Sequence, residues 1–360
     1  MNSTIQRWFF FNDHKKDHVK ALDGLRGVAV IMVLLAHSSS HKMNFHEAVT
    51  FVGIGKIGVY LFYVLSAYLL DRQISMALLN QTADSFFWKR YFLRRFLRIY
   101  PLFILSLFAF WSLTISGIKT KIESGRDVLE HILLLEGKGV FWSIPVEFKY
   151  YLLSPFILLV CHRYLKWDMK KIIIFFVVLI GAVFAFDMLL HFSKISTLKY
   201  LLVFLTGTTF AIYHLLVTPP EWVLKWKKGI AISGFIALIF CLFLNPNYLG
   251  DWSGIFDGNS GRKVMIFYSA LCGIMLFSAL YDKGAFKRFL ESSWLRFIGV
   301  ISFSIYLIHM MVIHLMTGFN LGIPDALKIY FFFGATILVS TISFLLIERP
   351  LSRIRISKRS

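Results

Sequence analysis

The sequence is poor in charged residues, which make up only 16% of its 360 positions. A soluble protein of ordinary composition carries about a quarter. Apolar residues make up 57% of the chain, the mean hydropathy is +0.67, and the apolar residues are gathered in long runs. Such runs are typical of helices that cross a bilayer rather than of a soluble core. The composition therefore predicts an all-α, polytopic membrane protein.

Cysteine is also scarce. Cys161, Cys241 and Cys272 lie far apart, within or beside apolar runs, and form no CxxC pair. Neither a disulfide framework nor a zinc site is therefore indicated, and we expect no metal. The sequence also lacks a visible internal repeat, which many transporters carry.

Acidic residues are outnumbered, with 20 Asp and Glu against 39 Lys and Arg, for a net charge of +19. The basic residues cluster in alternate loops between the apolar runs. A nucleic-acid-binding protein would need a contiguous basic surface on a soluble module, so no nucleic-acid partner is indicated. Basic loops beside apolar runs instead indicate contact with membrane lipids.

Ten apolar segments are long enough to be considered transmembrane helices. They cover about 24–40, 51–70, 99–117, 142–161, 171–191, 199–216, 229–244, 264–281, 297–316 and 326–347. An even number of spans places both termini on one side, and most Lys and Arg residues lie in the loops of that side. The positive-inside rule then predicts cytoplasmic termini. We expect one membrane domain over 1–360, with basic cytoplasmic tails at 1–20 and 348–360.

The first span carries two residues that are costly inside a membrane, Arg26 and His37, with ten residues between them. Eleven helical steps make three turns plus about 20°, so the two side chains share one face, about 16 Å apart along the axis. Ionisable groups at such depths cost a few kcal/mol and usually mark a functional site.

Depth separates the polar residues of the spans into two layers. Arg26, Arg95 and Arg98 lie near the predicted inner surface, and His37 and Glu147 lie past the middle. The outer layer also contains Ser143 and His309. Arginine suits a phosphate-bearing cytosolic ligand, since guanidinium binds phosphate in a bidentate manner. A histidine and a carboxylate suit general acid–base work on a hydroxyl. An acyl-coenzyme A donor, with a phosphorylated head and a thin arm, fits both layers.

Structural roles remain open for most of these residues. Arg26 is also explained as a snorkelling positive-inside residue, and Arg95 and Arg98 as topology determinants or lipid-headgroup contacts. His37 is equally compatible with a packing hydrogen bond. Glu147 is the hardest to dismiss, because a carboxylate in an apolar span needs a partner, and Lys149 points about 200° away from it.

With these residues in view, the chain resembles the acyltransferase 3 family of integral membrane acyltransferases. The resemblance rests on Arg26 and His37 within Leu-Asp-Gly-Leu-Arg-Gly-Val-Ala, and on the segment 58–68 that contains Ser66. It also rests on an R-x-x-R element at Arg95 and Arg98. Two further matches are an S-x-x-x-E element, formed by Ser143 and Glu147, and the late segment 302–309 that contains Tyr306 and His309.

The resemblance implies a ten-span enzyme that transfers acyl groups, most often acetyl, from coenzyme A to hydroxyls of surface glycans. It implies that His37 is the catalytic base or a transient acyl carrier, oriented by Glu147. The inner arginines would bind the acetyl-CoA donor. Candidate substrate-binding residues are Ser143, Tyr60, Tyr306 and His309.

The chain departs from the family pattern in two places: Tyr60 stands where many members have an acidic residue, and Ala67 where they have glycine. Because Tyr60 falls in the outer half of its span, the departure concerns the handling of the acceptor. Some members also carry a soluble hydrolase-like domain, and we expect a form that acts without one fused to it.

We therefore predict an O-acyltransferase of the bacterial inner membrane, most simply an O-acetyltransferase, that moves an acyl group from cytosolic acyl-CoA to a hydroxyl of a cell-surface or lipid-linked glycan. Two alternatives remain. A transporter or flippase of a lipid-linked sugar or anion would also place charges inside the membrane. A non-catalytic partner of a glycan-assembly enzyme would leave the inner arginines unexplained.

Overall fold

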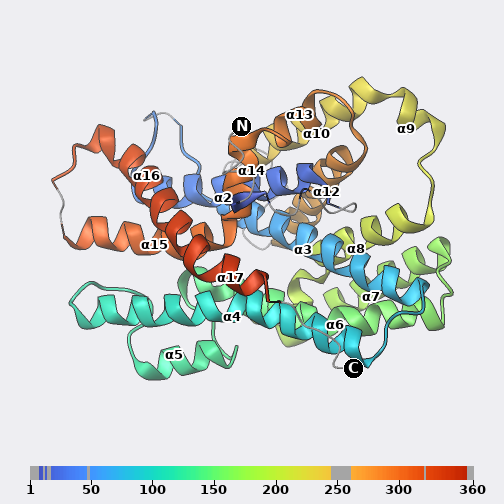
Figure 1. The fold of residues 1–360 in the computed structure, drawn as a ribbon, viewed down its shortest axis with the longest axis horizontal. Helices are drawn as coiled ribbons and strands as arrows, with labels where there is room; N and C mark the ends of the chain where they lie inside the picture. Colours follow the sequence, from blue (N-terminus) through green and yellow to red (C-terminus); the bar gives the residue numbers. More distant parts are fainter. Residues whose placement is uncertain are drawn as a thin grey trace. The chain divides into compact units, whose positions relative to one another are not determined.

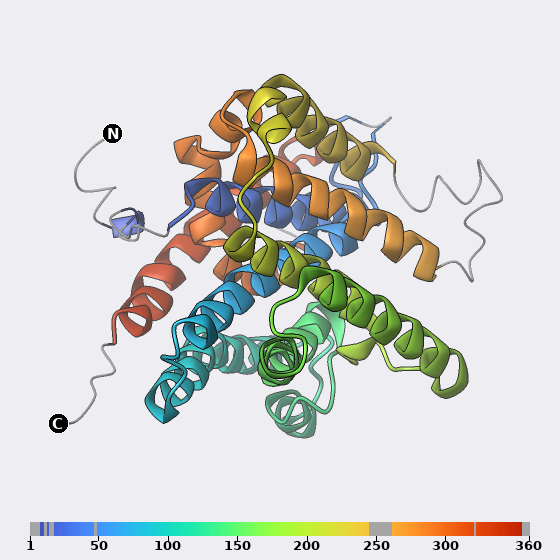
Figure 2. The ribbon, with the colours of Figure 1, turned by 90° about the vertical axis from the view of Figure 1, so that its right-hand side faces the viewer.

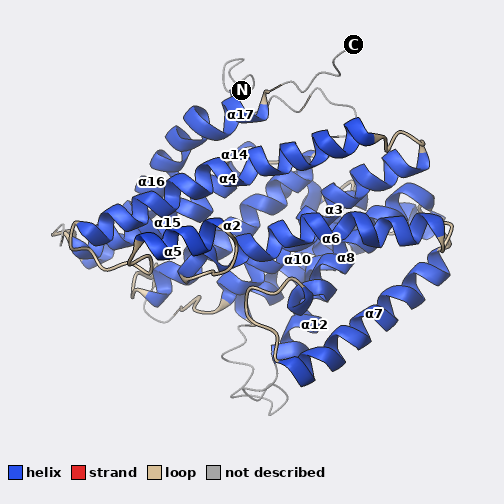
Figure 3. Ribbon diagram, turned by 90° about the horizontal axis from the view of Figure 1, so that it is seen from below, coloured by secondary structure: helices blue, strands red, loops and turns tan. Residues whose placement is uncertain are grey.

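The computed structural model describes residues 8–10, 13, 18–46, 49–244, 261–319 and 322–354. Within these residues the chain is a set of α-helices joined by loops, and no strand is present (Figures 1 and 3). The predicted all-α class is therefore confirmed. Most of the predicted tail 1–20, and residues 355–360 of the other tail, lie outside the described residues.

Most helices lie at the predicted spans, and several differ from them in their bounds. Their bounds are α2 (Lys20–Ser40), α3 (Ile54–Leu79), α4 (Ser85–Ile115), α5 (Gly125–Ile132), α6 (Ser143–Arg163), α7 (Met169–Leu190), α8 (Leu201–Leu216), α9 (Glu221–Lys225), α10 (Lys227–Phe243), α12 (Gly261–Tyr281), α13 (Ala285–Leu290), α14 (Ser293–Val300), α15 (Ser302–Gly318), α16 (Asp325–Ser343) and α17 (Arg349–Ser352). Two short 3-10 helices, η1 (Gly139–Trp142) and η2 (Leu198–Tyr200), adjoin α6 and α8, and a short π-helix, η3 (Phe344–Glu348), follows α16.

Each of the ten predicted spans overlaps a helix. Eight helical segments are long and apolar enough to cross a membrane, and the pair α14 and α15 raises this number to nine if it forms one span. The helix α10 is apolar but shorter. These lengths and compositions establish a multi-pass membrane protein.

The described residues form two compact units. The first unit comprises 1–65, 218–306 and 325–333, and the second comprises 66–217, 307–324 and 334–360. The helix α3 contributes its first half to one unit and its second half to the other. The single domain expected over 1–360 stays a prediction.

In the first unit, α2 packs against α14 through glycines (Figure 1). A Cβ on Gly299 of α14 would lie 1.7 Å from the carbonyl oxygen of Asp23, and one on Gly27 of α2 would lie 2.3 Å from that of Leu295. Only residues without a side chain permit so close an approach of two helix backbones. The helices α10 and α12 also run side by side in this unit (Figure 2).

The span predicted at 297–316 is not one straight helix. It consists of α14 and α15, which meet at Ile301 with a bend of 74°. Gly299, near the end of α14, lies directly against the backbone of α2. Apolar composition gave no sign of this turn, since the apolar run continues from α14 into α15.

The helices α3 and α4 are longer than predicted. The helix α4 begins at Ser85, where Asp84 caps it by accepting a hydrogen bond from the amide of Phe87 at 2.8 Å. It continues through Pro101, so the aromatic and basic stretch 86–101 is the first half of the same helix. The helix α3 likewise continues to Leu79, past the predicted end at 70. Charged residues near a span end marked a boundary in the sequence, but hydrogen bonding carries the helix through them.

Candidate active site

The helix α2 of the first unit carries Arg26 and His37 without interruption. The predicted sharing of one helix face is therefore confirmed, since it depends only on a continuous α-helix. Both side chains are half-buried. One turn beyond His37, the Nδ1 atom of His41 lies 2.8 Å from the carbonyl oxygen of His37, at the end of the helix.

Two predicted substrate residues, Tyr60 and Tyr306, also belong to the first unit. Tyr60 lies on α3 and is only 2% exposed, and the Lys56 ammonium lies 6.0 Å from its ring centroid. Tyr306 on α15 packs edge-on against Phe62, with ring centroids 6.4 Å apart. Both rings are thus packed within their own unit.

A charged cluster at the start of α2 was not predicted. The Nη2 atom of Arg296, on α14, contacts Asp13 and lies 3.5 Å from Asp23. His18 lies between the two carboxylates, 3.3 Å from Asp13 and 3.1 Å from Asp23. Arg296 is 4% exposed, so this ion pair is buried. The predicted span began at 297, one residue after Arg296, and only the contact between α2 and α14 shows this arginine as the partner of Asp23.

This cluster has the ligand atoms of a metal site, but it is already balanced by cations. Three possible ligand atoms lie within 4.8 Å of one another, one each from Asp13, His18 and Asp23. Burial raises the pKa of Asp13, but Arg296, Lys20 and His18 together hold it below its ordinary value. The two carboxylates are therefore the ion-pair partners of Arg296, and we assign no metal to them.

In the second unit, hydroxyl groups hold the predicted carboxylate Glu147. Its Oε1 atom accepts hydrogen bonds from Ser66 Oγ of α3 and from Tyr151 Oη, the latter at 2.5 Å. A carboxylate in an apolar helix needs hydrogen-bond partners, and these two hydroxyls provide them. Ser143, one turn before Glu147, is the first residue of α6 and is buried. Ser66 lay in a segment quoted for the resemblance, but nothing in the spacing paired it with Glu147.

Arg95 lies close to this carboxylate, in an aromatic cradle. Its guanidinium carbon is 5.6 Å from the ring centroid of Tyr151 and 5.9 Å from that of Tyr91, and Nη2 donates to Gln73 Oε1 at 3.2 Å. Tyr91 in turn donates to the carbonyl oxygen of Tyr151 at 3.0 Å. Arg98, one turn along α4, is exposed. The arginine and the carboxylate that the sequence assigned to separate layers are thus joined through one tyrosine.

A groove of about 480 Å³ runs along α4 and α6 beside this contact. Its lining is apolar except at Arg95, Tyr151 and Lys89, and the apolar part consists of Phe92, Leu93, Phe96, Phe148 and Leu152. Arg95 therefore lies at an otherwise largely apolar groove.

A second buried carboxylate, Asp71, was missed entirely. It is 0% exposed and accepts from Tyr150 Oη and Thr208 Oγ1, both at 2.6 Å, and from Ser154 Oγ. These hydroxyls join α3, α6 and α8. Because the predicted span ended at 70, Asp71 was read as a loop residue. Following the apolar pattern past residue 70 would have placed Asp71 inside the helix. His309 of α15 also belongs to the second unit and is 0% exposed.

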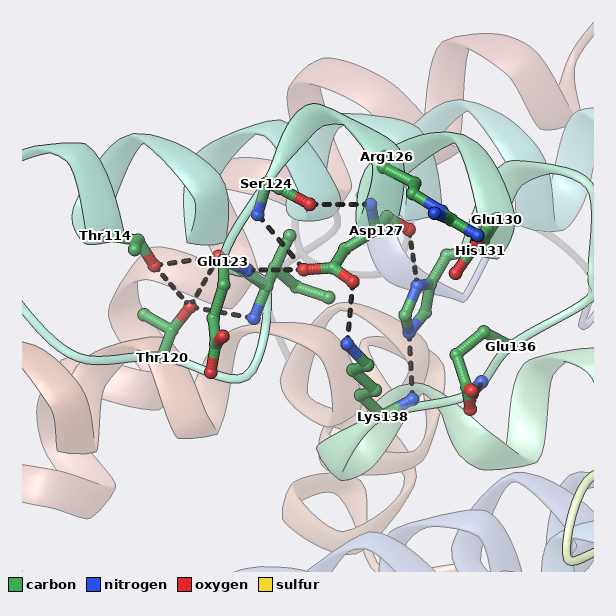
Figure 4. Close-up of polar contacts among 12 residues, drawn as sticks. Thr114, Thr120, Glu123, Ser124, Arg126, Asp127, Glu130, His131, Glu136 and Lys138 are labelled. Atoms are coloured by element: carbon green, nitrogen blue, oxygen red, sulfur yellow. Dashed lines mark hydrogen bonds and ion pairs between the residues drawn. The ribbon is translucent and has the colours of Figure 1, made fainter.

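The loop between α4 and α6 leads directly to Ser143, and polar contacts order it (Figure 4). Asp127 closes a capping box with Ser124 at the start of α5, and its Oδ1 accepts from Lys138 Nζ at 2.6 Å. His131 Nδ1 donates to the Asp127 carbonyl at 2.6 Å, and the Lys138 amide donates to His131 Nε2 at 2.8 Å. An imidazole that donates at one nitrogen and accepts at the other is neutral. Burial lowers the pKa of His131 accordingly.

The two units divide the predicted site residues. Arg26, His37, Tyr60 and Tyr306 lie in the first unit. Arg95, Arg98, Ser143, Glu147 and His309 lie in the second. Within the second unit Glu147 and Arg95 both contact Tyr151, and Ser143 lies one turn before Glu147 on α6. The predicted orientation of His37 by Glu147 joins residues of different units, and it stays a prediction.

Residues 19–348 match the acyltransferase 3 family, described as an acyltransferase domain. The chain belongs to this family. The match covers nearly the whole chain, including every candidate site residue, so the resemblance inferred from short motifs is confirmed.

Two relatives of this acyltransferase carry names that specify a reaction. It is 26% identical to the peptidoglycan O-acetyltransferase OatA of Listeria monocytogenes over 94% of this chain and 57% of that protein. It is 24% identical to a Staphylococcus aureus protein provisionally named an O-acetyltransferase, over 94% of this chain and 58% of that protein. The chain thus spans less than two thirds of the length of these relatives.

A third relative, an uncharacterized Haemophilus influenzae protein, is 28% identical over 54% of this chain and 90% of that protein. No solved structure matches the sequence.

Proposed function

We propose that this acyltransferase moves an acyl group, most simply acetyl, from cytosolic acyl-CoA to a hydroxyl of a cell-surface or lipid-linked glycan, in a bacterial inner membrane. The observation that supports it most directly is the contact of Arg95 and Glu147 with the same tyrosine. It brings a phosphate-binding cation and a carboxylate suited to acid–base chemistry into one site. The names of two relatives also specify O-acetyl transfer.

In the proposed reaction, the guanidinium groups of Arg26, Arg95 and Arg98 bind the phosphates of the donor. His37 removes the proton of the acceptor hydroxyl, and the oxygen attacks the thioester carbonyl. The C–S bond breaks as the ester C–O bond forms, and the coenzyme A thiolate takes up a proton. In the alternative route, His37 first accepts the acyl group from the thioester and then passes it to the hydroxyl.

The remaining residues have supporting roles in this proposal. Glu147 orients His37 and stabilises the imidazolium that forms, as carboxylates do in catalytic triads. Ser143, Tyr60, Tyr306 and His309 contact the acceptor or shape its path. The rival proposal, a flippase of a lipid-linked sugar, uses the same intramembrane charges but forms no ester bond.

The purified protein in lipid nanodiscs tests this proposal with [14C]acetyl-CoA and a glycan fraction from bacterial envelopes. Wild type should transfer label to glycan, and His37→Ala should lose transfer by at least about a hundredfold, the scale of a lost general base. His46→Ala is the matched control, because His46 is an exposed loop histidine. Full transfer by His37→Ala contradicts the assigned base, and binding of glycan without transfer by wild type favours the flippase.

A further inference from the structure

Tyr151 contacts both Glu147 and Arg95, two candidate site residues of the second unit. It is 1% exposed, its hydroxyl donates to Glu147 Oε1 at 2.5 Å, and its ring centroid lies 5.6 Å from the Arg95 guanidinium. Its backbone carbonyl accepts from Tyr91, whose ring forms the other side of the Arg95 cradle. The side chain therefore cannot move without disturbing both the carboxylate and the arginine.

The preceding residue shows that this arrangement is not a general property of buried tyrosines in α6. Tyr150 is buried as well, but it stacks on Phe204 at 4.0 Å and donates its hydroxyl to Asp71. Adjacent helix positions point about 100° apart, so the two hydroxyls reach different carboxylates. Tyr150 joins helices to one another, whereas Tyr151 joins two residues of the candidate site.

We propose that Tyr151 is a positioning residue that couples donor binding at Arg95 to the orientation of Glu147. This role rests on the proposed function. The ring fixes the guanidinium beside the groove by a cation–π contact, and the hydroxyl fixes the rotamer of the carboxylate. A donor phosphate that draws Arg95 into place thereby also sets the position of Glu147.

The two parts of the side chain can be removed separately. Tyr151→Phe keeps the ring and removes only the hydroxyl, so it should lower kcat about tenfold, the scale of one hydrogen bond to a charged group. Its KM for acetyl-CoA should stay near that of wild type. Tyr151→Leu also removes the ring, so it should in addition raise KM and weaken coenzyme A binding about fivefold.

Two controls separate positioning from a merely structural role. Tyr150→Phe removes an equally buried hydroxyl from the adjacent residue, and it should lower thermal stability while leaving kcat and KM unchanged. The second control is the variant pair Tyr151→Phe and Glu147→Gln. If the hydroxyl acts through Glu147, Tyr151→Phe should lower kcat much less in the Glu147→Gln background than in wild type.

Steady-state acetyl transfer and isothermal titration with coenzyme A, both in nanodiscs, provide these measurements. Unchanged coenzyme A affinity in Tyr151→Leu contradicts the role of Tyr151, whether or not wild type transfers acetyl. Multiplicative loss in the double variant, or an equal kinetic loss in Tyr150→Phe, contradicts it as well. Absence of transfer by wild type contradicts the proposed function, while a weakened affinity in Tyr151→Leu would still support the contact with a bound donor.

Discussion

The packing of α2 predicts the effect of one methyl group at Gly299. An alanine Cβ there would lie 1.7 Å from the Asp23 carbonyl oxygen, 2.7 Å from the Asp23 carbonyl carbon and 2.9 Å from the Gly27 amide nitrogen. All three are backbone atoms, so no side-chain rotation relieves the overlap, and α14 must move away from α2. Overpacking of this kind costs about 1 to 3 kcal/mol, and a displaced backbone costs more.

The expected result for Gly299→Ala is a lower unfolding temperature in detergent and reduced acyl transfer, because α2 also carries Arg26 and His37. Gly181→Ala is the matched control. Gly181 lies within α7, and an added Cβ meets nothing within 4 Å. Alanine is the better helix former by about 0.5 to 1 kcal/mol, so this variant should be slightly more stable than wild type. Wild-type stability in Gly299→Ala would refute the close approach of α2 and α14.

Two further predictions concern buried polar groups. Asp71→Asn should lower stability by about 1 to 3 kcal/mol in thermal unfolding, because three hydroxyls lose a charged acceptor, whereas Asn at the exposed Asp325 should have almost no effect. The loop that contains α5 should become less protected against hydrogen exchange as the pH falls below 6.5, the ordinary pKa of histidine. Below that pH, His131 binds a proton in the unfolded loop, whereas its lowered pKa keeps it neutral in the folded loop, so acid favours unfolding. His131→Gln should remove that dependence near pH 6, while Asp127, whose pKa the Lys138 hydrogen bond lowers to about 2, contributes a loss only below about pH 4.

Sequence reasoning was most successful where a property depends on one helix alone. The shared face of Arg26 and His37 needs only an unbroken apolar helix, and the positions of the apolar helices need only the apolar runs, although eight or nine of the ten predicted spans are long enough to cross a membrane. The same reasoning ended α3 at 70 and started α4 at 99, because charged residues were taken as boundaries. Both helices in fact continue through these residues.

Sequence reasoning could not identify the contacts between helices. A carboxylate at 147 required a partner, but the identity of that partner depends on which face of α3 meets α6. For the same reason Asp71 and its three hydroxyls stayed hidden, as did the pairing of Arg296 with Asp23. The close approach of Gly299 to Asp23 likewise becomes visible only when α14 lies against α2.

The central claim, acyl transfer rather than transport, is tested most directly by stoichiometry. The purified protein in nanodiscs is given acetyl-CoA and glycan, and free coenzyme A thiol and glycan-bound acetyl ester are counted in the same sample over time. Transfer predicts one ester for each thiol released, and loss of both in His37→Ala. Glycan that crosses the bilayer without thiol release or ester formation would contradict the account.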